Sequence, residues 1–138
     1  MKNTLSTLIN TASILLMLRF AGSKLMGAEI SVKSFEQFAS VLPINGPFFM
    51  YFVGGLELLV ALILVAVFIA RDANKEALLL YTGNFLLIGT LIGALFTEFL
   101  IRPEPVFFLV ALATGFLLLS GLQMGLYYQQ LVKPSHSV

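Results

Sequence analysis

Four long hydrophobic runs alternate with short polar segments along the chain. A membrane-spanning helix needs about 20 mostly apolar residues to cross about 30 Å of hydrocarbon. Four stretches meet this requirement, at roughly residues 5–26, 47–70, 77–99 and 105–128. The pattern therefore predicts an all-α integral membrane protein, in which residues 1–130 form one four-helix bundle and residues 131–138 form a polar tail.

The connections between the runs predict how successive helices turn back. Residues 71–76 form a charged connector, and Arg102-Pro103-Glu104-Pro105 forms a stiff stop, so spans two to four are expected to run alternately up and down. In the longer first link, Ser34 to Gln37 resembles a capping box that opens a short helix. Pro43 ends that helix, and residues 45–47 supply the turn into span two. We expect the short helix to lie at the membrane interface with one apolar side, made of Phe35, Phe38 and Leu42.

The composition fits this prediction. Of the 138 residues 59% are hydrophobic and 11% are charged, against roughly 25% charged in soluble domains, and the mean hydropathy is +0.97. The net charge is +1 with no basic run, so we do not expect nucleic acid as a partner. The chain has no cysteine, which excludes disulfides, thiolate metal sites and CxxC redox chemistry, and we predict no metal site.

Basic residues near the span ends favour one orientation. Lys2, Arg71, Lys75 and Lys133 fall on one side, against Lys24, Lys33 and Arg102 on the other. This distribution predicts that both termini face the cytoplasm. As an alternative for the first run, Lys2 before an apolar stretch with small residues at 21–23 also fits a cleavable signal peptide.

Two charged residues interrupt the first two runs and are the main candidates for a site. Charged side chains inside a bilayer are costly and mark pairs or functional positions. Arg19 lies roughly 10 Å from the expected outer end of span one, and Glu57 roughly 15 Å from that of span two. We therefore expect Arg19 and Glu57 to form an ion pair, with Lys24 and Glu98 nearby. Two interpretations stay open: a structural ion pair, or a polar ligand-binding pocket open to the outer side and lined by all four.

Other polar and small residues in the runs indicate packing. Asn84 and Gln123 are expected to hydrogen bond between spans three and four, and paired glycines in three spans to bring helices close. These glycines are Gly54 with Gly55, Gly89 with Gly93, and Gly121 with Gly125. The four tyrosines, at 51, 81, 127 and 128, suit an interfacial aromatic belt. The single histidine, His136, lies in the polar tail and is given no catalytic role.

Several motifs in order resemble the DoxX-like family of small four-span membrane proteins. They are the segment from Leu18 to Leu25 with its arginine and Gly-x-Lys, then Phe35 to Phe38 leading to Leu42-Pro43, and Gly54-Gly55-Leu56-Glu57 followed by Arg71. The resemblance covers most of residues 10–125. The chain departs from the family pattern at residues 58–61, where it has Leu-Leu-Val-Ala in place of the family's Gly-rich run.

The resemblance implies a four-helix bundle of the cell inner membrane, often associated with quinone-linked oxidoreductase complexes. We therefore expect a non-catalytic or cofactor-binding membrane subunit that holds a quinone or a lipid. The sequence carries no self-sufficient catalytic constellation, so whether the chain is an enzyme stays open. Two alternatives are a scaffold or assembly factor for other membrane proteins, and a small proton-coupled transporter that uses Glu57. Membrane lipid, a larger membrane complex or a homodimer are the expected partners.

Overall fold

A computed structural model describes residues 3–132, and five helices account for most of this part of the chain. They are α1 (Thr4–Leu25), α2 (Glu29–Val41), α3 (Gly46–Ile69), α4 (Ala73–Leu100) and α5 (Phe107–Val132). Strands are absent from residues 3–132. The predicted all-α class is confirmed, and each expected span coincides with one long helix to within a few residues at either end.

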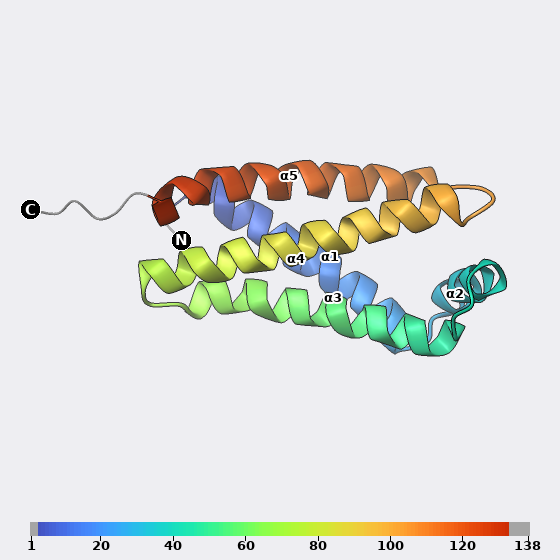
Figure 1. Cartoon of the computed structure of the whole chain (residues 1–138). Coiled ribbons are helices and arrows are strands. Elements are labelled where there is room, and N and C mark those ends of the chain that lie inside the picture. The colour runs from blue at the N-terminus through green and yellow to red at the C-terminus, as the bar shows by residue number, and fades with distance from the viewer. Residues whose placement is uncertain (1–2, 133–138) are drawn as a thin grey trace, which may run out of the picture.

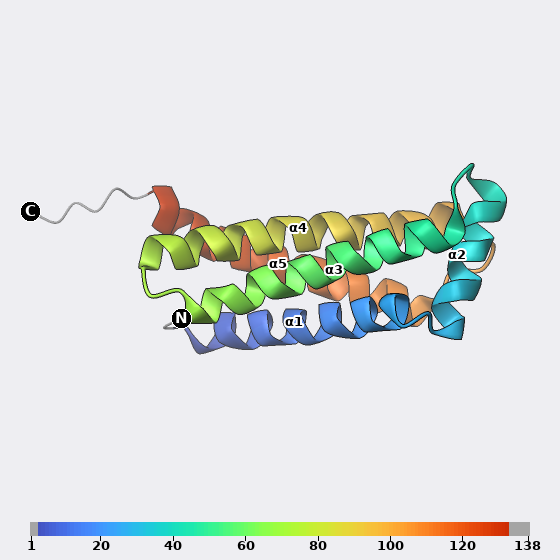
Figure 2. The ribbon, with the colours of Figure 1, turned by 90° about the horizontal axis from the view of Figure 1, so that it is seen from below.

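The four long helices lie along a common axis, and α2 lies across one end of them (Figures 1 and 2). The closest pairs are α1 with α3, α3 with α4, and α4 with α5. Helix α1 contacts α5 much less, so the seam between these two helices is the loosest in the bundle.

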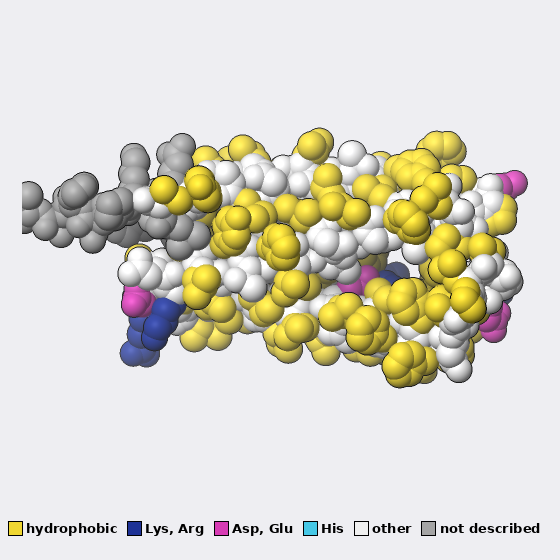
Figure 3. Space-filling model, in the orientation of Figure 1, with side chains coloured by type: hydrophobic (Ala, Val, Ile, Leu, Met, Phe, Trp, Pro, Cys, Tyr) yellow, Lys and Arg dark blue, Asp and Glu magenta, His cyan; other side chains and the backbone are white. Residues whose placement is uncertain are grey.

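The outer surface of the bundle is apolar, as a membrane protein requires. In the part of the chain that the structure describes, four helices are long and apolar enough to cross a membrane: α1, α3, α4 and residues 107–128 of α5. Large hydrophobic side chains such as Leu15, Phe85 and Leu118 are more than 60% exposed. Figure 3 shows hydrophobic side chains over much of one face, with basic residues gathered at the end opposite α2. The chain has the architecture of a multi-pass membrane protein.

Local side chains explain where the long helices begin. The side chains of Asn3, Asn45 and Asp72 each accept a hydrogen bond from a backbone N–H in the first turn of α1, α3 and α4. These bonds satisfy donors that a helix leaves unpaired at its N-terminus. The cap at Asp72 starts α4 at Ala73, four residues before the expected beginning at 77. The charged connector therefore becomes part of the first turn of α4.

Two other predicted boundaries were wrong. Helix α2 begins at Glu29 after Ala28, which makes no side-chain cap, so Ser34 lies within the helix. Its hydroxyl donates instead to the carbonyl of Ile30, one turn earlier. At the C-terminus, α5 continues to Val132, so the first two residues of the expected tail are helical. The rest of the tail, 133–138, which includes His136, lies outside the described residues.

The middle of the bundle is a dry apolar cluster. Buried side chains from all four long helices form it, and Phe20, Leu95 and Phe116 pack against its edge. Its members are Ile14, Met17, Val60, Ala61, Leu64, Leu87, Leu91 and Ala113. This central cluster separates the two ends of the bundle interior from each other.

Glycine allows close approach of another helix at three of the described glycines of the long helices. At the first residue of α3, a Cβ on Gly46 would lie 3.0 Å from the carbonyl oxygen of Phe35 on α2. A Cβ on Gly54 would lie 3.0 Å from Lys24 Cβ, and a Cβ on Gly83 would lie 2.5 Å from Leu64 Cδ2. The expected packing role is therefore right for Gly54, wrong for Gly55, which has open space beside it, and was missed for Gly83. It is wrong for the pairs Gly89 with Gly93 and Gly121 with Gly125. A Cβ on any of these four would meet no other described atom within 4 Å.

Replacement of Gly83 tests the α3–α4 contact. Gly83→Val should lower the free energy of unfolding by about 1–3 kcal/mol, because the added carbons overlap the fully buried Leu64 side chain. Gly89→Val on the same helix is the matched control, since it makes the same change of helix propensity where there is space. Unfolding of both variants in detergent would be followed by circular dichroism. Equal stabilities would contradict the close approach.

Candidate functional site

A buried ion pair joins the end of α1 to the middle of α3. The Nζ atom of Lys24 donates to both carboxylate oxygens of Glu57, at 2.8 and 2.9 Å. The side chains are only 16% and 6% exposed, respectively. We call Lys24 and Glu57 the inner pair. In this position the attraction is weakly screened, and either charge alone would be expensive.

The sequence around Glu57 explains how Lys24 reaches it. Gly54 lies one turn before Glu57 on α3, and its missing side chain leaves room for the Cβ atom of Lys24. Lys24 also lies over the ring of Phe20, with Nζ 5.2 Å from the ring centroid, so a cation–π contact supports the ammonium group on a second side. Gly54 therefore admits the lysine, and Glu57 neutralises it.

A second buried pair lies at the connection between α4 and α5. One nitrogen of Arg102 is 3.4 Å from Glu98 Oε1, while the backbone N–H of Val106 donates to Glu98 Oε2 at 3.0 Å. Both side chains are about nine-tenths buried, at 12% and 9% exposure. We call Glu98 and Arg102 the hairpin pair. It closes the turn from α4 into α5, because one carboxylate binds both sides of the connection.

Arg102 also fastens α2 to the end of the bundle. Its guanidinium donates to Ser34 Oγ at 2.6 Å and lies 5.9 Å from the ring of Phe38. Phe35 and Phe38 are buried against Met50 and Ile101, which confirms the expected apolar side of α2 for the two phenylalanines. Leu42 is 37% exposed and does not belong to this side. Sequence reasoning missed Arg102, although its spacing of four residues from Glu98 is typical of a helical ion pair.

The expected pairing of Arg19 with Glu57 is not formed. Arg19 is exposed on the outer face of α1, and both oxygens of Glu57 bond to Lys24. Arg19 follows the fully buried Met17 by two residues, which turns its side chain by about 200° away from the core. The prediction compared only how deep Arg19 and Glu57 lie in the membrane. The direction in which each side chain points around its helix axis also decides which side chains meet.

The structure brings the four predicted residues together only in part. Lys24 and Glu57 form one pair, Glu98 belongs to the separate hairpin pair, and Arg19 joins neither. In Figure 3 acidic and basic side chains are visible at the bottom of an opening in one face, in the half of the bundle nearer α2. Charged groups are therefore buried at the α2 end of the bundle, in balanced acid–base pairs.

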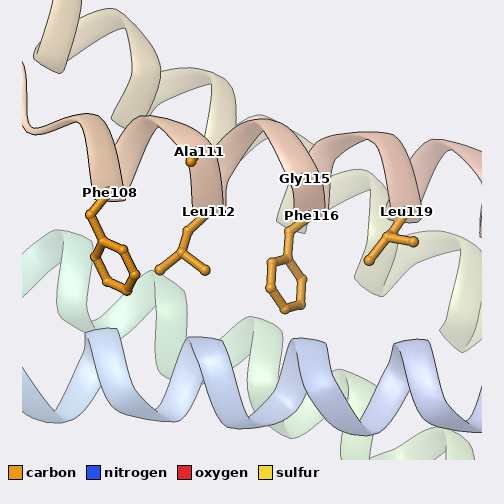
Figure 4. Close-up of a pocket in the computed structure, with 6 residues that line it drawn as sticks. All are labelled: Phe108, Ala111, Leu112, Gly115, Phe116 and Leu119. Atoms are coloured by element: carbon orange, nitrogen blue, oxygen red, sulfur yellow. The ribbon is translucent and has the colours of Figure 1, made fainter.

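An apolar groove, lined by residues of α5 alone, lies on the side of α5 that faces α1 (Figure 4). It has a volume of about 250 Å³. Side chains of α5, among them Phe108, Leu112, Phe116 and Leu119, point from α5 toward α1 (Figure 4). Two small residues, Ala111 and Gly115, complete the lining. We call this hollow the α1–α5 groove. A smaller cavity of about 200 Å³ lies between α2 and the start of α3, beside Phe35 and Met50.

These places offer both polar and apolar groups to a bound molecule. Within residues 3–132 no three His, Asp or Glu side chains cluster closely enough to hold a metal ion. The two buried pairs offer cationic donors and carboxylate acceptors, and the groove offers an apolar surface. This combination suits a molecule with a polar head and a hydrocarbon tail.

Comparison of the chain with protein-family models, with curated proteins and with solved structures gives no match.

Removal of one partner of the inner pair should destabilise the protein strongly. Lys24→Met should cost about 3–5 kcal/mol, because it leaves the Glu57 carboxylate buried and unpaired. The double variant Lys24→Met with Glu57→Gln should regain much of this loss, because both charges are then gone. Unfolding in mixed detergent micelles measures both effects.

Arg19→Met is the matched control for that measurement. We expect a change within about 0.5 kcal/mol, since Arg19 is exposed. A loss at Arg19 as large as the loss at Lys24 would show that the arginine, and not the lysine, neutralises Glu57.

Proposed function

We propose that this chain is a DoxX-like integral membrane protein that binds a quinone or a lipid and serves as a membrane subunit of a quinone-linked redox complex. The observation that carries the proposal is the α1–α5 groove, an apolar hollow that begins at the end of the bundle where the two buried ion pairs lie. The groove suits the hydrocarbon tail of a quinone or lipid, and the ion pairs suit its polar head group. The motifs at residues 18–25, 35–38 and 54–57 support the family assignment.

Neighbouring residues relate the groove to both ion pairs. Phe108, at one end of the groove, follows Val106 by two residues, and the N–H of Val106 bonds to Glu98 of the hairpin pair. Phe116, which lines the groove, and Phe20 pack against the same central cluster. Phe20 in turn lies under the ammonium group of Lys24. A tail in the groove would thus bring its head within reach of charged groups at the α2 end.

The pairs have the chemistry to hold such a head. Lys24 and Arg102 can donate hydrogen bonds to quinone carbonyl or lipid phosphate oxygens, and Glu57 and Glu98 can accept from hydroxyl groups. The Nε atom of Arg102 is buried and has no hydrogen-bond partner among the described residues, so one strong donor is available. With no cysteine, and its one histidine outside the expected spans, the chain would bind the molecule while a partner supplies electrons.

In this proposal the bundle crosses the cell inner membrane four times, alternately up and down. The connection around Arg71 and Lys75 and both termini face the cytoplasm, as the positive-inside rule favours. Helix α2 lies at the outer interface, with exposed Glu29 and Lys33 toward water and Phe35 and Phe38 toward the bundle. The ligand head would then be held near the outer surface.

A second candidate function is a scaffold or assembly factor for other membrane proteins, and one observation favours it. Gly89 and Gly93 on α4, like Gly121 and Gly125 on α5, leave open space outside the bundle within the described structure. Small residues at one-turn spacing allow a helix of a partner or of a second copy to approach closely. Purification in a gentle detergent with no copurifying chain and no dimer would count against this function.

A proton-coupled transporter is a third candidate, and it requires Glu57 to release Lys24.

Filling the groove tests the proposed binding function. Gly115→Leu places a large side chain in the groove. It should weaken binding of decylubiquinone by on the order of tenfold, because the leucine occupies the space in which the tail would bury its surface. Gly121→Leu is the matched control, because Gly121 lies on the same helix but does not line the groove. Titration of both variants in nanodiscs, followed by thermal shift, gives the affinities.

Mass spectrometry of the molecules extracted from the purified protein distinguishes the two ligand sources. Retained quinone that Gly115→Leu removes supports the quinone, and retained phospholipid that the same variant removes supports the lipid. Binding that is equal in Gly115→Leu, Gly121→Leu and the natural chain would overturn the proposal.

A further inference from the structure

A layer of uncharged polar side chains crosses the bundle interior at the end opposite α2. It contains residues from α1, α4 and α5, and every one of them is 0% exposed. We call this set the polar layer: Ser6, Asn10, Ser13, Asn84, Ser120 and Gln123. Burying polar groups without partners in a membrane bundle costs free energy. The presence of six buried polar side chains in one region therefore needs an explanation.

Hydrogen bonds and helix geometry place these residues within about 10 Å of one another along the bundle axis. Gln123 Nε2 donates to Ser6 Oγ at 2.9 Å, which brings α5 and α1 to the same level there. Asn10 lies about 6 Å further along α1, and Ser120 lies about 4.5 Å further along α5 in the same direction. Ser13 follows Asn10 by about one turn.

The other two helices join the layer at the level of Asn10. Asn10 Nδ2 donates to the carbonyl of Leu64 on α3 at 3.0 Å. The close contact of Leu64 with Gly83 brings α4 to that level, and Asn84 is the next residue. The polar side chains of α1, α4 and α5 therefore lie at neighbouring levels, beside the backbone of α3.

Each amide in the layer uses its NH₂ group and leaves its oxygen free. Asn84 Nδ2 donates to the carbonyl of Leu80, as Asn10 does to Leu64 and Gln123 to Ser6. Because each partner is a carbonyl oxygen, each NH₂ group must face it, and the amide oxygen points the other way. Five buried atoms of the layer have no hydrogen-bond partner among the described residues: Asn10 Oδ1, Asn84 Oδ1, Gln123 Oε1, Ser13 Oγ and Ser120 Oγ.

We propose that the polar layer is an internal hydration site that holds ordered water molecules between the four helices. Three of the free atoms are amide oxygens, which accept hydrogen bonds and cannot donate them. Their common partner must therefore be a donor, and water donates two hydrogen bonds while it accepts from the serine hydroxyls.

The charge of the layer favours water over a cation. No carboxylate belongs to it, and the nearest acid along α3, Glu57, is seven residues from Leu64, about 10 Å, and bonds to Lys24. A cation in the layer would carry an uncompensated charge inside the bundle. The central cluster, with Ile14 and Met17, separates the layer from the inner pair, and a second apolar cluster, which includes Leu80 and Tyr127, lies on its other side.

Proton-detected solid-state NMR of the full chain in lipid tests the hydration site. Magnetisation transfer from water should reach the side-chain NH₂ groups of Asn10, Asn84 and Gln123. Exposed Gln37 provides a positive control, and the backbone amide of Leu91 in the central cluster provides a negative one. Asn84→Leu should reduce the water signal at Asn10 at least twofold, because it removes one acceptor and fills space.

Two results would overturn the proposal. One is water transfer at Asn10, Asn84 and Gln123 in the natural chain that is no stronger than at Leu91. The other is a saturable shift of the three amide signals when sodium replaces N-methylglucamine, without water transfer, since that result would assign the layer to a cation. If Asn84→Leu does not fold, the comparison of water transfer at the three amides with that at Leu91 in the natural chain tests the proposal without the variant.

Discussion

Hydrocarbon offers no hydrogen bonds, and this constraint governs the whole arrangement of polar groups in the bundle. A buried polar or charged side chain therefore needs a partner within the protein or in a water molecule that the protein holds. Lys24 and Glu57 pair across α1 and α3, and Glu98 and Arg102 pair across the turn into α5. The interior consequently has three levels: charged pairs near α2, an apolar cluster in the middle, and an uncharged polar layer at the far end.

Helices α1 and α5 contact each other less than the other neighbouring long helices do, and they are joined at one end more than at the other. At the far end the two helices are joined by Ser6, which bonds to Gln123 and Tyr127. Toward α2 no such bond is found among the described residues, and the seam opens into the α1–α5 groove. Tyr127 was expected at a membrane interface, but it is 6% exposed and belongs to this joint. Gln123 was expected to bond to span three, and it bonds to α1 instead.

Several features could be predicted because they depend on neighbouring residues alone. The mean hydropathy of a run determines whether it can cross a bilayer, so the number of spans and their approximate ends followed from the pattern. Phe35 and Phe38 were correctly assigned to the buried side of α2, since a spacing of three residues keeps two side chains on one face. Candidate site residues were found by charge in an apolar run, which identified Glu57 and Lys24 but equally Arg19.

Four membrane-spanning helices could be predicted from the chain alone, because hydrophobicity and run length are local properties. Which charges meet could not, because the answer depends on how each helix is rotated against its neighbours in the folded bundle. A stripe of small and polar residues at Ser6, Asn10, Ser13 and Ala21 marks the inner face of α1 and leads to Lys24, so helical periodicity contained a signal against Arg19. The α1–α5 groove carried no comparable signal, because a gap between helices arises from packing at their other faces.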